Sequence, residues 1–235
     1  MSYSNPVFIP GPTNLPESVR RAIDLPTIDH RSPAFAEAMP KLFAGLRSIF
    51  ATKSPHIFVF PSTGTGGWEA TIANTLSPGD KVLACRHGVF SDKWIRMCEA
   101  FGLVVDVIEC DWRGPADPAL IEAALLADQN HAIKAVLATH NETATGVRSD
   151  LKAIRESIDR AEHNALFFVD GVSSIASMDF QMDAWGIDAA VTGSQKGFMM
   201  PAGLAIVAVS EKAIDAGKTA TLPRFFFDFK QMGQM

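Results

Sequence analysis

Apolar and polar positions follow each other along the chain in blocks of two kinds. Longer blocks with apolar residues at helical spacing cover residues 33–50, 66–76, 89–101, 117–128 and 149–162. Short, strongly apolar blocks with the length of buried strands cover residues 56–60, 81–85, 104–109, 133–139, 166–169, 189–192 and 204–209. From residue 56 onward the two kinds alternate. This pattern predicts an α/β fold, a mostly parallel seven-stranded sheet flanked by helices.

The two ends of the chain depart from this pattern. Four of the eight residues at 9–16 are Pro or Gly, so we expect this stretch to be extended. It belongs to an N-terminal arm predicted over residues 1–30, which is followed by one large domain over residues 31–235. Residues 223–229 are an aromatic run close to the last residue. Exposed aromatic runs usually meet a partner or more chain, so we expect this run to be uncovered and the sequence to be truncated.

Composition narrows the class of protein. No apolar run is long enough to cross a membrane, and the first residues lack the basic and apolar regions of a signal peptide. Cys85, Cys98 and Cys110 are odd in number and lack CxxC spacing, which favours a reducing compartment and argues against a disulfide framework or a zinc site. The net charge of −5, with scattered basic residues, argues against nucleic-acid binding. We therefore expect a cytoplasmic protein that acts on small molecules and holds no metal.

Two polar residues follow the strands predicted at 166–169 and 189–192. Asp170 comes directly after the first strand, and Lys196 lies in a glycine-flanked turn after the second. An aspartate at a strand end can hold a protonated ring nitrogen such as that of pyridoxal phosphate (PLP), and a lysine in a tight turn can form an imine. Taken alone, each residue is better explained as a solvated lysine or a helix-capping aspartate, and the pair points to PLP only together with the motif that precedes it.

A glycine-rich turn follows the first predicted strand. Residues 61–70, PSTGTGGWEA, offer backbone N–H groups, hydroxyls and a helix N-terminus to an anion. Glu69 stands where a dinucleotide fingerprint needs its third glycine, and no Lys-Ser/Thr pair follows the glycines as in a P-loop. A single phosphate monoester therefore fits better than a pyrophosphate, although a plain capped turn is the alternative.

Six motifs in this order resemble the class V aminotransferases, PLP enzymes of fold type I, of the serine–glyoxylate and alanine–glyoxylate kind. The motifs are PGPTN at 10–14, DHRSP at 29–33, STGTG at 62–66, THNETATG at 139–146, DGVSS at 170–174 and GSQKG at 193–197. The resemblance covers the whole chain. It implies a ping-pong Schiff-base mechanism that moves an amino group from a small L-amino acid, with serine favoured over aspartate or alanine, to glyoxylate.

The resemblance also assigns roles to single residues. It makes Lys196 the Schiff-base lysine and Asp170 the partner of the pyridine nitrogen. The other matching positions would bind the cofactor's phosphate, contact its ring or pack on its two faces: Thr63, Gly64, Thr65, Gln195, Thr143, Phe90 and Val172. Gly11 matches a position that helps to enclose the substrate, in relatives across the interface of a homodimer.

Family members continue as a smaller C-terminal domain, which carries the arginine for the substrate carboxylate and contacts to the neighbouring subunit's phosphate. We expect that domain to be absent from this chain. Two alternatives remain open. One is a class V lyase of the cysteine desulfurase type, for which none of the three cysteines is well placed. The other is a fragment that binds PLP without turnover.

Overall fold

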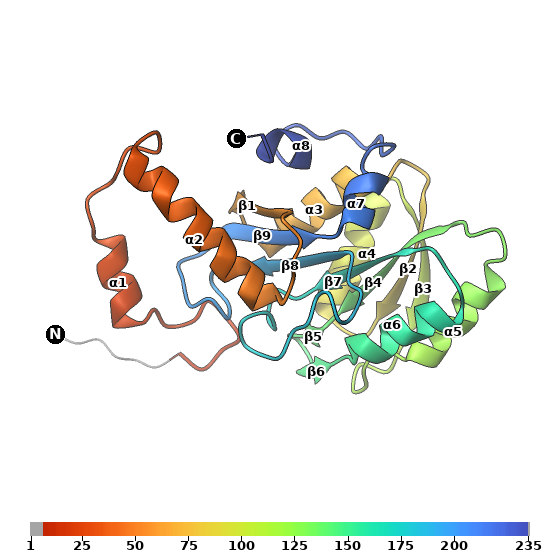
Figure 1. Ribbon diagram of the computed structural model, residues 1–235. Helices are drawn as coiled ribbons and strands as arrows, with labels where there is room; N and C mark the ends of the chain where they lie inside the picture. The colour runs from red at the N-terminus through yellow and green to blue at the C-terminus, as the bar shows by residue number, and fades with distance from the viewer. Residues whose placement is uncertain (1–6, 235) are drawn as a thin grey trace.

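The computed structural model describes residues 7–234 and is built around a seven-stranded sheet (Figure 1). Residues 1–6 of the predicted arm lie outside the described residues. In sheet order the strands are β1 (Ile57–Ser62), β9 (Gly203–Val209), β8 (Ala189–Gly193), β7 (Leu166–Asp170), β4 (Ile133–Thr139), β2 (Lys81–Arg86) and β3 (Val104–Glu109). Within this seven-stranded sheet, as described, β9 runs antiparallel to both of its neighbours, and the remaining pairs are parallel. The predicted fold class and all seven strands are confirmed.

Helices cover both faces of the sheet. One face carries α2 (Pro33–Phe50), α5 (Pro118–Ala127) and α6 (Leu151–Arg160). The other carries α3 (Gly64–Thr75), α4 (Val89–Ala100), α7 (Glu211–Ala216) and α8 (Phe229–Met232). The five helices predicted from the sequence are all present, whereas the short α7 and α8 were not foreseen.

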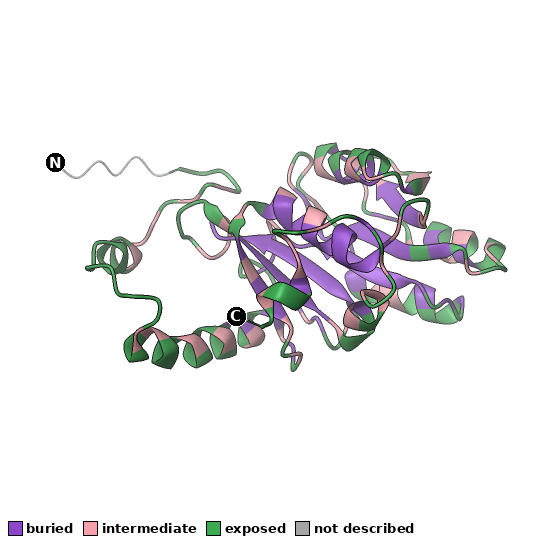
Figure 2. Ribbon diagram, turned by 90° about the horizontal axis from the view of Figure 1, so that it is seen from above, coloured by how far each residue is buried: buried purple, intermediate pink, exposed green. Residues whose placement is uncertain are grey.

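Alternation along the buried strands explains the two apolar layers. On β7, Phe167 and Val169 belong to the layer under α2, α5 and α6, whereas Leu166 and Phe168 belong to the layer under α3 and α4. Successive side chains of a strand point to opposite faces, so a continuous apolar run fills both layers. Figure 2 shows the buried strands between the two helical layers. The rigid sheet positions the polar residues that follow the strand ends.

The N-terminal arm is not wholly extended. Residues Glu17–Ile23 form helix α1, in which no side chain is buried. Both α1 and the N-terminal part of α2 lie away from the sheet and are largely exposed in Figure 2. A helix of seven residues without an apolar face gives little periodic signal, which is why the sequence did not reveal it.

The expectation of an uncovered aromatic run at the C-terminal end is only partly right. Phe225 and Phe226 are exposed, but Phe229 is buried and stacks on Phe58 of β1 with ring centroids 4.3 Å apart. The backbone N–H of Phe229 donates to the Asn74 side chain of α3 at 2.9 Å. Phe227 and Phe229, in the later part of the run, thus pack on β1, while Phe225 and Phe226 face outward.

Across residues 7–234, no helix combines the length and the apolar character that a membrane span requires.

Candidate active site

Two neighbouring parallel strands bring Asp170 and Lys196 together. Asp170 is the last residue of β7, and its register partner on β8 is Val191. Strand β8 ends at Gly193, and Lys196 follows in the next turn. Because parallel strands end at the same edge of the sheet, the two side chains meet at its carboxyl edge, where open α/β sheets bind their ligands.

A cavity of about 130 Å³ opens at this edge of the sheet. Eleven residues line it: Thr63, Gly64, Thr65, Trp68, Phe90, Thr143, Asp170, Val172, Ser173, Gln195 and Lys196. All nine residues that the sequence nominated for cofactor binding are among them. Trp68 and Ser173 were not nominated, since nothing in the sequence separates them from ordinary core and turn positions.

The glycine-rich turn forms the N-terminus of α3 at one end of the cavity. The helix begins at Gly64, and the side chain of its N-cap residue, Thr63, makes no capping hydrogen bond. The first N–H groups of a helix carry a partial positive charge and favour an anion. The glycines also permit close packing, because a Cβ at Gly64 would overlap Val172 and one at Gly67 would overlap Val191. Dense packing on the sheet is thus a further reason for these glycines, beside the anion binding and the tight turn that the sequence suggested.

Asp170 is an unusual acid because its carboxyl group is buried. Burial, and to a smaller extent the nearby Glu142 carboxylate, raise its pKa, and the hydrogen bond from the Val172 N–H (2.9 Å) opposes this shift, with a net pKa of about 7. A cationic partner beside the carboxyl would favour the ionised form. The indole Nε1 of Trp68 is buried, makes no hydrogen bond among the described residues and acts to lower the pKa of Asp170.

The N-terminal arm lies against Lys196. The Lys196 ammonium donates to the Gly11 carbonyl at 3.2 Å, and the Thr13 N–H donates to the Gln195 carbonyl at 3.1 Å. A Cβ at Gly11 would overlap the Lys196 side chain. Burial lowers the pKa of Lys196, and the Asp170 carboxylate partly offsets that effect. Gly11 therefore reaches the lysine of its own chain, at the mouth of the same site.

Glu142 is a positioning residue that sequence analysis did not single out. Its fully buried carboxylate accepts hydrogen bonds from the N–H groups of Phe90 (3.1 Å), Ser91 (2.9 Å) and Ala144 (3.1 Å). It therefore caps the N-terminus of α4, whose first turn carries Phe90 into the cavity. The hairpin of β5 (Asn141–Glu142) and β6 (Val147–Arg148) holds Glu142 in place.

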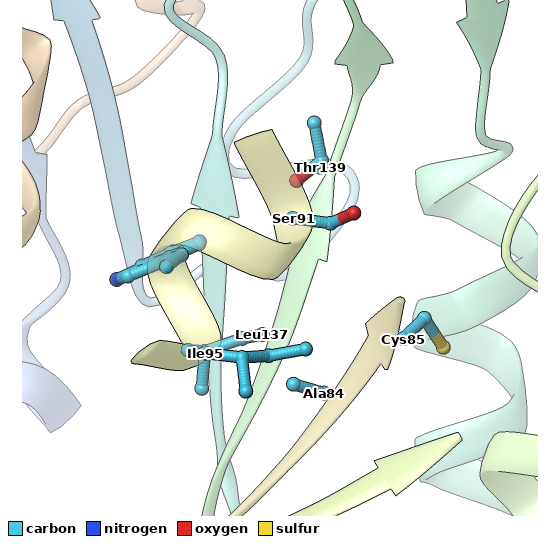
Figure 3. A pocket seen from close by; sticks show the side chains of 7 residues that line it. Ala84, Cys85, Ser91, Ile95, Leu137 and Thr139 are labelled. Atoms are coloured by element: carbon cyan, nitrogen blue, oxygen red, sulfur yellow. The ribbon is translucent and has the colours of Figure 1, made fainter. Parts of the chain in front are cut away.

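Helix α4 is also packed tightly on the sheet. Figure 3 shows the space beneath it, lined among others by Ser91, Ile95, Leu137 and Thr139, and this space leaves no room for a water molecule. Cap and packing together fix the position of Phe90.

Replacing Glu142 with alanine is expected to destabilise the fold. The change removes a carboxylate that accepts three N–H groups, and unpaired buried donors are unfavourable, so we expect a loss of roughly 2–4 kcal/mol in the free energy of unfolding. Urea denaturation measures it. Glu156→Ala is the control, since Glu156 is exposed and its ion pair with Lys152 is long, at 3.8 Å. Equal stability of the two variants would contradict the role of Glu142.

The residues around the cavity fit PLP. The uncapped start of α3 and the hydroxyls of Thr63 and Thr65 suit a phosphate, and Gln195, which also lines the cavity, has a side-chain NH2 group that can donate to a phosphate oxygen. The buried Asp170 carboxyl suits a protonated ring nitrogen. Phe90 and Val172, which both line the cavity, are apolar side chains suited to the faces of an aromatic ring.

Comparisons with known proteins agree with this geometry. Residues 17–222 match the family model described as aminotransferase class-V. The chain is 58% identical over 232 residues to the L-aspartate–glyoxylate aminotransferase of Paracoccus denitrificans, covering 99% of this chain and 59% of that protein. It is 50% identical over 235 residues to the serine–glyoxylate aminotransferase of Hyphomicrobium methylovorum, covering 99% of this chain and 58% of that protein.

Solved structures show the same similarity. The ureidoglycine–glyoxylate aminotransferase of Bacillus subtilis superimposes with a TM-score of 0.90 at 30% sequence identity, covering 100% of this chain and 60% of that one. The chain thus spans about three fifths of the length of the curated relatives that it matches.

Proposed function

This chain belongs to the class-V aminotransferase family, and on that premise we propose that it is a PLP-dependent aminotransferase that transfers the amino group of a small L-amino acid to glyoxylate. The observation that carries the proposal is that Asp170 and Lys196 line the same cavity as the uncapped N-terminus of α3. Serine is the favoured donor, with aspartate and alanine as alternatives. One of the two similar relatives is named for aspartate and the other for serine, and these names support serine and aspartate as donors.

Each part of the cavity would hold a different part of the cofactor. The N-terminus of α3, with Thr63, Thr65 and Gln195, would bind the phosphate. Asp170 would pair with the ring nitrogen, Thr143 would lie near the ring, and Phe90 and Val172 would pack on its faces: all of these residues line the cavity. When bound, PLP supplies an electron sink for the electron pair released at the substrate Cα.

The remaining chemistry falls to two side chains. The lowered pKa of Lys196 increases the neutral fraction of an amine that would condense with the cofactor's aldehyde group and release water. Once the amino group of the donor has displaced it, the free Lys196 amine could accept a proton from the substrate Cα and return it elsewhere. Asp170, once ionised beside a cation, would hold the proton on the ring nitrogen. Gly11 of the arm would help to enclose the substrate next to Lys196.

The test is formation of glycine from glyoxylate by the chain supplied with PLP, with L-serine, L-aspartate or L-alanine as donor. The proposal requires glycine to form with at least one donor and the matching 2-oxo acid to appear in equal amount. Decay of the donor without glycine formation would favour a lyase. That alternative has little support, because Cys85 and Cys98 are buried and Cys110 is half-buried at the end of β3. PLP binding without consumption of any donor would favour the non-catalytic alternative.

We also propose that the protein forms a homodimer. In the described part of the arm and in α2, Ile23, Leu25, Ile28 and Leu42 are between 46% and 68% exposed, and such an apolar surface is typical of an interface. Light scattering should give twice the mass of one chain, and a monomer at micromolar concentration would contradict the proposal.

Domain organisation and location are proposed on similar grounds. The buried core begins with Leu46 of α2, which supports a large domain over residues 31–235 preceded by an arm over residues 1–30. The three cysteines are free thiols, which supports a reducing compartment such as the cytoplasm.

A further inference from the structure

Lys93 lies next to the phosphate end of the cavity. It follows Phe90 by three residues on α4, so the two side chains project from the same face of the helix. Its ammonium donates a hydrogen bond to the Thr65 hydroxyl at 3.2 Å, and Thr65 lines the cavity at the first turn of α3. A lysine from one helix therefore contacts the anion-binding turn of another.

The charge of the site leaves a role for this lysine. Among the side chains that line the cavity, Lys196 is the one basic group, and in the proposed reaction it is engaged at the aldehyde carbon. A phosphate monoester carries between one and two negative charges at neutral pH, whereas a helix N-terminus offers roughly half a positive charge. The acidic groups nearby, Asp170 and Glu142, add no compensation. The phosphate end thus lacks a full cation from the cavity lining itself.

The ammonium of Lys93 is available to fill this role. Its neighbour Asp92 is already paired with Arg86 and Arg96, and within residues 7–234 no carboxylate pairs with Lys93. The Thr65 hydroxyl accepts its hydrogen bond from Lys93, so its own proton is free to be donated elsewhere, including into the cavity.

We propose that Lys93 is a phosphate-binding residue: its ammonium, which contacts Thr65, would place the missing positive charge next to the phosphate. The inference rests on the proposed function and deepens it, because it names the group of this chain that distinguishes a phosphorylated from an unphosphorylated pyridoxyl ligand. Lys93 is exposed and sits on a flexible stem, so its ammonium can approach the phosphate without moving α4.

The proposal can be tested by measuring the binding of two ligands that carry an amine in place of the aldehyde and therefore cannot form an imine with Lys196. Pyridoxamine 5′-phosphate and pyridoxamine differ by the phosphate alone, and titration calorimetry gives a dissociation constant for each. Lys93→Met removes the charge and keeps an unbranched side chain. We expect it to weaken binding of pyridoxamine 5′-phosphate about 5- to 10-fold at low salt, the range for a partly screened charge-assisted contact. Binding of pyridoxamine should not change.

Two further variants make the test specific. Lys93→Arg should restore most of the affinity, and the difference between Met and wild type should shrink at high salt. Lys134→Met is the matched control, because Lys134 is an exposed lysine of β4 that contacts the carbonyl of His131 and no cavity residue.

The outcomes separate the two proposals. Unchanged phosphate-ligand affinity in Lys93→Met, or equal weakening of both ligands, would overturn the role of Lys93 while the cofactor assignment stands. Failure of the unaltered chain to bind pyridoxamine 5′-phosphate would overturn the cofactor assignment, and the role of Lys93 with it.

Discussion

Replacing Lys196 with alanine is expected to abolish amino-group transfer, with a rate loss of roughly 10⁴-fold or more. The lysine is the one basic side chain among the residues that line the cavity, and it lies beside the buried acid that ends the adjacent strand. No other described side chain there combines an amine with a lowered pKa. Both the covalent attachment of the cofactor and the proton shuttle at the substrate Cα would be lost together.

The same variant separates chemistry from binding. Lys196→Ala should still bind pyridoxamine 5′-phosphate, because the N-terminus of α3, Gln195 and Asp170 are unchanged. Lys152→Ala is the control, since Lys152 is an exposed residue of α6 that does not line the cavity. Glycine formation from glyoxylate is the measurement for both variants. Turnover by Lys196→Ala within ten-fold of the unaltered chain would contradict the assignment.

Replacing Asp170 with asparagine is expected to have effects of opposite sign on activity and on stability. Asparagine cannot hold a proton on the ring nitrogen, so amino-group transfer should fall by about 10²- to 10⁴-fold. The cofactor-free chain, in contrast, should become more stable, because a buried carboxylate is unfavourable when no described basic side chain forms a close ion pair with it. A residue that serves catalysis can thus weaken the fold that carries it.

The stability difference between Asp170→Asn and the unaltered chain should depend on pH, and the pKa of Asp170 fixes the direction of that dependence. The folded pKa of Asp170, about 7, lies above the value of an unfolded aspartate, near 4, so the folded state binds the proton more tightly. Ionisation of Asp170 therefore weakens the cofactor-free fold as pH rises through this window. The stability advantage of Asp170→Asn should grow by roughly 2–3 kcal/mol between about pH 5 and about pH 8.

Urea denaturation of the cofactor-free chain at the two pH values measures this difference. Asp106→Asn serves as the control, because Asp106 is a half-exposed residue of β3 whose partner is Lys81 at the surface. An advantage for Asp170→Asn that stays constant with pH would show that Asp170 is not the buried acid described here.

The centre of the sheet could be predicted because strands such as β7 and β8 are buried on both faces. Runs such as Leu166–Phe167–Phe168–Val169 leave no polar position for solvent, so they mark central strands without ambiguity. The two key side chains could be nominated because each follows such a run. Parallel strands end at a common edge, which makes proximity of Asp170 and Lys196 a consequence of topology.

Other parts of the site depend on contacts that sequence spacing does not encode. Glu142 caps α4 across 52 residues of chain, and the interaction of Lys93 with Thr65 spans 28. Trp68 lines the cavity from within α3, where an aromatic residue is equally typical of core packing. The aromatic run at 223–229 was misjudged for the same reason, because its docking surface is formed by β1 and α3 near the start of the chain.

The visible absorbance spectrum of the chain supplied with PLP tests the proposed aminotransferase activity most directly. We expect a band of lysine-bound PLP that L-serine, or else L-aspartate or L-alanine, bleaches and that glyoxylate then restores. The donor would leave its amino group on the cofactor and free Lys196, and glyoxylate would take up that amino group and let Lys196 bond to the cofactor again. A spectrum without such a band, or a band that no amino donor alters, would contradict the account.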